Sequence, residues 1–520
     1  MIGVRSTHAG RWRGYDAALV FLVLMVCFAR VSDTLTDPDL YGNIRFGLDH
    51  IEAGGLPTED PYSYLTTGQT WSNHEWAAEW VFAVVYRAAG STGLILLKSV
   101  ITLLIVTLAY VHLLGRGWPV LRAGLLILLL TFAMLAGVAS VRPQLFTYLG
   151  FTLILLAIES ADRGVARAMF FLPLIIASWT SFHGGFLAGV GIALIWLFVQ
   201  TTMWLAKRLR PSLQLTVLPL PFLLVTAVAV ALAPLLNPYG VELLTFLWRT
   251  ATVPRPEIAE WVPIDIASQS GLVWATLAAL GIAGVTTPRA RSHPALIVVW
   301  LVSIVLPWSA VRHLPLAALA TVILLANPIA ERLRSLRRPD VATNDRRPSP
   351  LMVAAIVFLA LFMLATASRR LDCIRMTTDG GFAFPVRAVA VLKQAQVEGN
   401  AAVFFDWGHY VIWHLAPSVK VSIDGRRETV YSPEVYQRNV DFLYGVRDWN
   451  RLLIEPPPDF VLVSRHFPVF ALMAARADWQ QAYSDSLAGI FVPSRSKWLQ
   501  TIRDVVPPDV PADGKGMCFP

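Results

Sequence analysis

The sequence is poor in charged residues, and this scarcity excludes an ordinary soluble protein. Asp, Glu, Lys and Arg make up only 15% of the 520 residues, whereas 55% of the residues are hydrophobic. Soluble domains carry roughly 25% charged residues. The composition therefore indicates a chain that lies largely in lipid.

Cysteine is also scarce, and no CxxC metal or redox motif is present. The three cysteines are Cys27, Cys373 and Cys518. Cys27 falls in the first apolar run, while the other two lie at the ends of the C-terminal region. If that region is outside the cytoplasm, Cys373 and Cys518 are candidates for a disulfide; two free thiols are the alternative.

Apolar runs of about 17 to 25 residues recur between Tyr15 and Ser368, each long enough to cross a bilayer as a helix. No such run follows Arg369. The first run is too long for a signal peptide and is expected to be an uncleaved anchor. We predict an all-α polytopic membrane bundle with about eleven spans, at 15–34, 92–114, 119–139, 143–160, 167–182, 185–206, 213–235, 270–287, 294–310, 312–330 and 351–368.

The net charge of +8 is better explained by membrane topology than by nucleic-acid binding, because the basic residues gather in short loops. Residues 75–90 carry acidic and aromatic side chains together, which favours a helix at the interface. With this stretch outside the bilayer, the Arg-rich loops fall on the side of the basic N-terminus, which the positive-inside rule makes cytoplasmic. We expect a multi-pass protein of the bacterial cytoplasmic (inner) membrane.

This topology divides the chain into a transmembrane domain, 1–368, and a soluble domain, 369–520. The first outer loop covers 35–91, and a cytoplasmic loop covers 331–350. In the second domain, strand candidates lie at 401–405, 420–424 and 459–463, and helical patterns at 408–415 and 469–477. These alternating elements predict an extracytoplasmic α/β domain.

Polar residues collect at the predicted outer ends of the spans, where ionisable groups near hydrocarbon usually mark functional paths. A carboxylate there acts as a general base toward a hydroxyl, and Arg and His stabilise a phosphate leaving group. We assign Asp37 and Asp39 as catalytic candidates. The candidates for binding a donor phosphate are Arg142, His183, Arg312 and His313; those for the acceptor side are His74, Glu75, Asn237 and Tyr239.

Each candidate also has a structural explanation. Asp37 and Asp39 suit a helix start, the arginines suit contacts with lipid headgroups, and Asn237 and Tyr239 suit a turn. His183 suits a packed turn, and His74 and Glu75 suit a helix cap. Glu257 and Glu260 suit a solvated surface. In the C-terminal domain, Asp424 and Arg426 suit either a glycan or phosphate site or a turn with a surface salt bridge.

A divalent cation is a further expectation to weigh. Oxygen-rich ligands suit magnesium or manganese, and a set of five side chains is available in the first outer loop. Their spacing is not diagnostic, so we assign no metal ligands. The set comprises Asp37, Asp39, His74, Glu75 and Glu79.

The segments DPDLYGNIRFG, TEDPYSY, WSNHEW, VRPQLF, FHGGF, LNPYG, DWGHYVIWHL and SIDGRRE resemble uncharacterised bacterial membrane proteins described as GT-C-like. More broadly, an Asp-containing loop after the first span resembles the GT-C superfamily, which includes protein mannosyltransferases and aminoarabinose transferases. The resemblance implies inverting transfer of a sugar from a polyprenyl-phosphate donor, with Asp37 or Asp39 as base. A second acidic motif is not evident.

The leading hypothesis is therefore a glycosyltransferase of the cell envelope. Its partners are a polyprenyl-phosphate-linked sugar, membrane lipid and a hydroxyl acceptor on a glycan, lipid or protein. A lipid-linked glycan transporter or flippase is one alternative, although charges deep within the spans are sparse. A non-catalytic envelope assembly protein is another.

Overall fold

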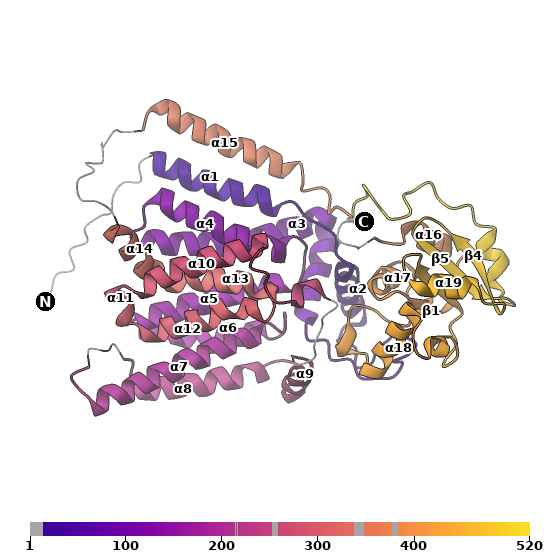
Figure 1. Cartoon of the computed structure of the whole chain (residues 1–520), viewed down its shortest axis with the longest axis horizontal. Helices are drawn as coiled ribbons and strands as arrows, with labels where there is room; N and C mark the ends of the chain where they lie inside the picture. Colours follow the sequence, from indigo (N-terminus) through magenta and orange to yellow (C-terminus); the bar gives the residue numbers. More distant parts are fainter. Residues whose placement is uncertain (1–13, 214, 216, 252–257, 337–347, 377–382) are drawn as a thin grey trace.

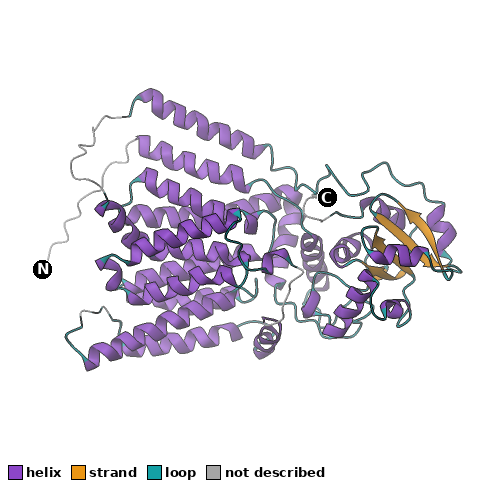
Figure 2. Ribbon diagram, viewed as in Figure 1, coloured by secondary structure: helices purple, strands orange, loops and turns teal. Residues whose placement is uncertain are grey.

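A computed structural model of the chain describes residues 14–213, 215, 217–251, 258–336, 348–376 and 383–520. It has two parts, which lie end to end in Figure 1. One part is a bundle of roughly aligned helices. The other carries all the strands and lies beyond one end of the bundle (Figure 2).

The bundle has a helix at every predicted span. Five helices of the described residues are long and apolar enough to cross a membrane, or six if the bent pair α13 and α14 counts as one span; five others are apolar but shorter. The number of spans, about eleven, thus stays a prediction. The helices are α1 (Gly14–Val31), α3 (Trp76–Gly115), α4 (Val120–Met134), α5 (Gln144–Asp162), α6 (Phe171–Trp179), α7 (Phe186–Leu209), α8 (Leu220–Leu232), α10 (Gln269–Val285), α12 (Pro294–Val305), α13 (Leu314–Leu324), α14 (Ala326–Ser335) and α15 (Pro350–Ser368).

The predicted interfacial helix and the span after it form the single 40-residue helix α3, broken at Gly90. Gly90 has φ 57° and ψ −148°, a backbone conformation that is open essentially to glycine alone. The break therefore separates the acidic and aromatic first part of α3 from its apolar second part.

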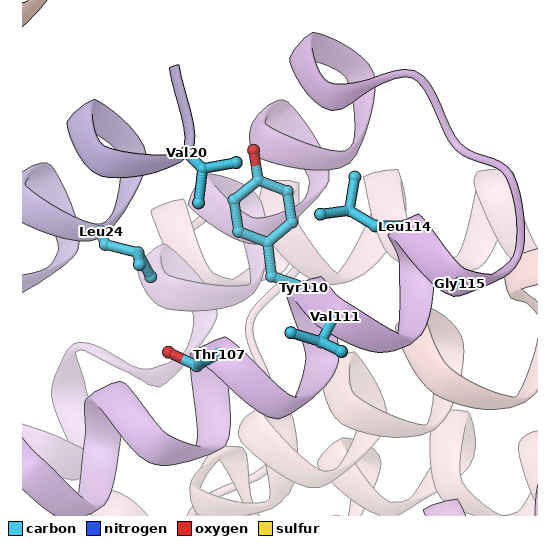
Figure 3. Close-up of a pocket in the computed structure, with 7 residues that line it drawn as sticks. All are labelled: Val20, Leu24, Thr107, Tyr110, Val111, Leu114 and Gly115. Atoms are coloured by element: carbon cyan, nitrogen blue, oxygen red, sulfur yellow. The ribbon is translucent and has the colours of Figure 1, made fainter. Parts of the chain in front are cut away.

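The centre of the bundle is α13, every residue of which is buried. By contrast, α15 packs mainly on α1 and leaves most of its apolar side chains exposed. A helix that is apolar on all sides is stable when lipid or other helices surround it. A pocket of about 360 Å³ between α1 and α3 is lined mostly by apolar side chains around Tyr110 (Figure 3).

The bundle end away from the sheet holds a buried ionic network. Glu159 accepts from both Arg116 and Arg163, and His293 Nδ1 lies 2.6 Å from Asp162 Oδ2. Pairing makes burial of these charges tolerable. Of the predicted cytoplasmic loop 331–350, residues 337–347 lie outside the described residues.

The C-terminal part contains a mixed five-stranded sheet in the order β2-β1-β3-β5-β4. Strands β1, β2 and β3 are parallel, while β5 runs antiparallel to both β3 and β4. The three predicted strands correspond to β1, β2 and β3; β4 and β5 were not predicted. The strands are β1 (Gly399–Val403), β2 (Val419–Val421), β3 (Phe460–Ser464), β4 (Trp479–Ser484) and β5 (Ala488–Pro493); the helices are α16 (Val386–Gln394), α17 (Gly408–Leu415), α18 (Pro433–Tyr444), α19 (Pro468–Ala474) and α20 (Trp498–Arg503).

Cys373 and Cys518 form the disulfide considered from the sequence. Arg375 pairs as an isolated β-bridge with Leu35 on one side and with Cys518 on the other. The chain segments that enter and leave the C-terminal part are thus fastened together, and both are fastened to the start of the first outer loop.

The predicted outer loop is the connection between the two parts. Its helix α2 (Pro38–Ala53) lies between the bundle and the sheet in Figure 1. One side of α2 packs against α3 and another against α17. A short helix, α9 (Val241–Ala251), lies at the same end of the bundle.

Candidate active site

The first turn of α2 places the two predicted catalytic carboxylates in different surroundings. Asp37 is the N-cap: its Oδ1 accepts from the Asp39 backbone N–H at 2.9 Å, and Pro38 follows at the first helical position. Its Oδ2 accepts from Ser140 Oγ at 2.8 Å and from Arg142 Nε. The capping explanation for Asp37 is therefore correct, and the side chain is fully engaged.

Asp39 contacts a different element, and its side chain is 44% exposed, so its carboxylate is accessible to a ligand. Its Oδ1 lies 3.3 Å from Nδ1 of His409, the second residue of α17. Burial disfavours the charged form of Asp39, but His409 and Arg142 outweigh it and lower the pKa of this carboxyl. Asp39 is therefore the ionised, reachable carboxylate of the pair.

His409 links Asp39 to a second carboxylate. Its ring is 3% exposed, and Nε2 lies 3.3 Å from Asp424 Oδ1. Burial alone would lower the pKa of His409, but the carboxylates of Asp39 and Asp424 raise it to about 9. The ring N–H groups are not well directed at either carboxylate, so the contacts are ion pairs of an imidazolium between two anions.

Asp424 is held rigidly by Arg426 and Tyr431. Arg426 Nε and Nη2 donate to its two oxygens at 2.9 and 2.7 Å, and Tyr431 Oη donates at 2.7 Å. Arg426 Nη1 also donates to Asp60 Oδ1 at 2.6 Å. Arg426 thus ties the C-terminal part to the first outer loop.

The expectation of a surface salt bridge between Asp424 and Arg426 is wrong, because both side chains are buried. The guanidinium lies 4.8 Å from the ring centroid of Trp71, 5.1 Å from that of Tyr62 and 5.2 Å from that of Phe46. All three rings belong to the outer loop or α2, and they exclude water from the pair. A role for Asp424 and Arg426 in ligand binding stays a prediction.

Two glycines make the contact between Asp39 and His409 sterically feasible. A Cβ atom on Gly425 would lie 2.3 Å from Asp39 Oδ1 and 2.6 Å from His409 Cε1, and one on Gly42 would lie 2.7 Å from the His409 ring. Close packing therefore requires a glycine at this position of IDGRRE, whatever the conformation of the turn.

Arg142 and Arg312 converge on one carboxylate. Arg142 Nη1 donates to Glu260 Oε2 at 2.9 Å, and Arg312 Nη1 donates to Glu260 Oε1 at 3.4 Å. The Arg312 guanidinium also lies 4.5 Å from the Trp261 ring centroid. Glu260, expected on a solvated surface, instead bridges the two predicted phosphate-binding arginines and is 36% exposed. Glu257 lies outside the described residues.

Glu75 lies between two histidines. Its Oε1 is 3.6 Å from His74 Nε2 and 3.6 Å from His183 Nε2. Burial, together with the charges of Glu79 and Asp39, raises the pKa of Glu75 to about 8. His183 Nδ1 accepts from the Gly185 N–H at 3.0 Å and lies 2.6 Å from Thr147 Oγ1, so the ring proton is on Nε2, facing Glu75.

The remaining candidates are mainly structural in this geometry. The hydroxyl of Tyr239 accepts from the Asn73 N–H at 3.1 Å, and Asn237 Oδ1 accepts from the Tyr239 N–H at 2.7 Å. His313 Nδ1 lies 3.2 Å from the Leu306 carbonyl oxygen. The Nδ1 atom of His313, a donor-side candidate, thus faces a backbone carbonyl and not another candidate side chain.

The described part of the chain contains no group of three or more His, Cys, Asp or Glu side chains arranged to hold a metal ion. The side chains considered for a cation do not converge on one point: Asp37 is with Arg142, Asp39 with His409, Glu79 accepts from Asn73, and Glu75 lies near His74. A divalent cation stays a prediction.

Sequence reasoning missed His409, Asp60 and the bridging role of Glu260. The DWGHY and IDGRRE segments were noted, and both lie in this site, but nothing in their spacing connects them with Asp39. Asp406 of DWGHY was also unassigned; burial and the charge of Asp39 raise its pKa to about 7.

Comparison with known proteins places the fold. No protein-family model and no curated protein sequence matches the chain. Among solved structures, the oligosaccharyltransferase of Archaeoglobus fulgidus in the apo form has a TM-score of 0.55 at 12% identity, covering 88% of this chain and 70% of that one. The same enzyme tethered to an acceptor peptide with an NVT sequon has a TM-score of 0.52 at 13% identity, covering 86% and 69%.

ArnT from Cupriavidus metallidurans, bound to undecaprenyl phosphate, is more distant, with a TM-score of 0.48 at 13% identity over 92% of this chain and 98% of that one. At such identities a structural likeness establishes the fold alone. The apolar helices indicate a membrane protein, and the likeness shows that this chain has the fold of the archaeal oligosaccharyltransferase.

Proposed function

We propose that the protein is a glycosyltransferase that moves a sugar from a polyprenyl-phosphate donor to a hydroxyl acceptor on the outer side of the cytoplasmic membrane. The observation that carries this proposal is the accessible carboxylate of Asp39, held ionised by His409 at one end of the bundle. The chain would cross the membrane about eleven times, with a soluble domain from residue 369 outside.

The placement of charge supports this orientation. Asp33, Asp37, Arg142 and Arg375 meet at the end of the bundle nearest the sheet, whereas Arg116 and Arg163 meet at the opposite end. The loops whose excess of Arg and Lys predicts the cytoplasmic side therefore lie opposite Asp39. A disulfide between Cys373 and Cys518 suits an oxidising compartment.

In the proposed reaction, Asp39 accepts the proton of the acceptor hydroxyl while that oxygen attacks the anomeric carbon of the sugar. The bond from the anomeric carbon to the phosphate oxygen breaks, and polyprenyl phosphate leaves with an additional negative charge. Because His409 is an imidazolium paired with Asp39 and Asp424, it keeps Asp39 in the ionised form that a general base requires.

The donor phosphate is proposed to occupy the position between Arg142 and Arg312 that Glu260 now takes. Two guanidinium groups that converge on a carboxylate are also arranged for a phosphate. Glu260 is partly exposed and is therefore able to move aside. Glu75 and His74 are proposed to face the acceptor, and His183, which contacts Glu75, is proposed to remain on the donor side.

The test is transfer from a set of polyprenyl-phosphate sugars by protein in nanodiscs, with and without a chelator. Wild type should transfer at least one sugar, and Asp39→Asn should reduce the rate by about 10² to 10⁴, the usual contribution of a general base. Arg142→Ala should raise the donor KM. Transfer by Asp39→Asn at the wild-type rate would refute the assignment, and no transfer with any donor would favour the assembly role.

A further inference from the structure

A pocket of about 290 Å³ lies where the C-terminal end of α2 meets the C-terminal part of the chain. One wall is α2 and the loop that follows it, and the other is the segment that joins α17 to β2. Neither part of the chain forms the pocket alone. Its size is at the lower limit for small-molecule sites, enough for one sugar ring rather than a whole oligosaccharide.

Most of the wall is apolar and rigid. Three prolines and the ring of Tyr62 contribute flat surfaces, and small side chains leave space between them. Such surfaces suit the carbon-bound face of a pyranose ring, which is apolar although its edge carries hydroxyls. The apolar wall residues are Ala53, Pro57, Pro61, Ala416, Pro417 and Val419.

A polar trio forms the rest of the wall. Asp49 Oδ2 accepts from Tyr62 Oη at 2.6 Å and from Arg45 Nε at 2.9 Å. Within the described residues, Asp49 Oδ1 and the two terminal nitrogens of Arg45 make no other hydrogen bond. One acceptor and a fork of donors, fixed in orientation by Tyr62, therefore remain for a ligand.

A buried histidine completes the pocket. His50 is 5% exposed, and neither ring nitrogen has a hydrogen-bond partner among the described residues; Nδ1 lies 3.7 Å from Glu79 Oε2. Burial lowers the pKa of His50 to about 4, so the ring is neutral near pH 7. Both ring nitrogens are shielded, and the ring adds an uncharged surface to the pocket wall.

The charges in the pocket select the class of ligand. The carboxylate of Asp49 repels an anion such as phosphate, and Arg45 offsets its charge. Apolar walls with paired donors and acceptors instead match a neutral, polyhydroxylated ring. We infer that this pocket binds one neutral sugar unit of the acceptor, which is therefore a glycan; this inference rests on the proposed function.

The position of the pocket also limits the length of the acceptor. Asp39 and Asp49 lie on the same helix, ten residues apart, which is about 15 Å along the axis. A sugar held at Asp49 therefore reaches Asp39 only as part of an oligosaccharide several units long. The distance between the pocket and Asp39 thus sets a minimum length for the acceptor.

The test uses saturation-transfer NMR to measure binding of neutral hexose oligosaccharides, one to six units long, to the full-length protein in nanodiscs. No donor is present. At least one oligosaccharide should bind, and inorganic phosphate should not compete. Ala53→Trp fills the pocket without removing a hydrogen bond and should weaken binding at least tenfold. Glu52→Trp places the same ring on the exposed neighbouring position and should leave binding unchanged.

Asp49→Asn, checked for an unchanged melting temperature, should also weaken binding, whereas Asp39→Asn should retain it. Absence of binding by every sugar tested, equal binding by Ala53→Trp, or competition by phosphate would overturn the inference. Because no donor is present, loss of transfer with binding retained would count against the proposed reaction alone. Transfer with no sugar binding would count against the pocket alone.

Discussion

The imidazole Nδ1 of His409 lies 3.3 Å from Oδ1 of Asp39, so a residue of the C-terminal part contacts a carboxylate in the first turn of α2. The candidate site is therefore composite. Its carboxylate comes from the first outer loop, its arginines from the bundle, and the group that sets its charge from beyond the last bundle helix.

The ion pairs of His409 predict a stability that depends on pH. The pKa of His409 is raised from 6.5 to about 9 in the folded protein, so its contribution is fully present below pH 6.5 and is lost as the pH rises through 9. His409→Gln should therefore lower the melting temperature by several degrees at pH 6 and by much less at pH 10. His466→Gln, at an exposed position, is the control, and a pH-independent difference would contradict the prediction.

Glu75 predicts a second pH effect of the same sign. Its pKa is raised from 4.5 to about 8, so the folded state retains a proton that the unfolded state releases, and stability falls as the pH rises from 4.5 to 8. Glu75→Gln should therefore stabilise the protein at pH 8.5 and change little at pH 4.5. Thermal unfolding at both pH values tests this, with the exposed Glu52→Gln as control; equal effects at both would refute it.

Close packing at Gly425 predicts a large effect from one methyl group. In Gly425→Ala the new Cβ would lie 2.3 Å from Asp39 Oδ1, so Asp39 and His409 must separate. We expect transfer to fall at least tenfold and the pH dependence assigned to His409 to weaken. Gly55→Ala, where a Cβ meets nothing within 4 Å, should behave as wild type. Unchanged activity in Gly425→Ala would show that the contact is dispensable.

The disulfide predicts a definite thiol count. Denatured, unreduced protein should expose one reactive thiol, that of Cys27, and reduction should raise the number to three. Replacing both Cys373 and Cys518 by serine should lower the free energy of unfolding of the C-terminal part by about 2 to 4 kcal/mol. Denaturant titration, followed by a spectroscopic signal from that part, measures this change. Three reactive thiols before reduction would refute the bond.

The helical architecture was predictable from sequence because lipid imposes long apolar runs, and these runs correspond to helices throughout the bundle. Strands β1, β2 and β3 were predictable because each lies in a short, mostly apolar segment; β3 is buried along its whole length, and β1 and β2 are buried at most positions. Strand β4 was not, because its exposed Gln480 and Gln481 at the sheet edge obscure the hydrophobic pattern.

The residues of the candidate site were easier to predict than the contacts between them. Asp39, Arg142, Arg312 and Glu75 stood out because charge near hydrocarbon is unusual. The pairing of Asp39 with His409 was not predictable, because it depends on how α17 docks against α2. For the same reason Arg426 looked like a surface residue: the rings that cover it belong to a segment far away in the sequence.

The β-bridges of Arg375 with Leu35 and Cys518 have a consequence for biosynthesis. The first outer loop is made early, but the residues that fasten it, up to Phe519 against Tyr41, are made much later. A ribosome-bound chain therefore has Asp39 without its histidine partner. The proposed activity should therefore appear only after the segments that carry His409 and Phe519 have been made, and shorter nascent chains should be inactive.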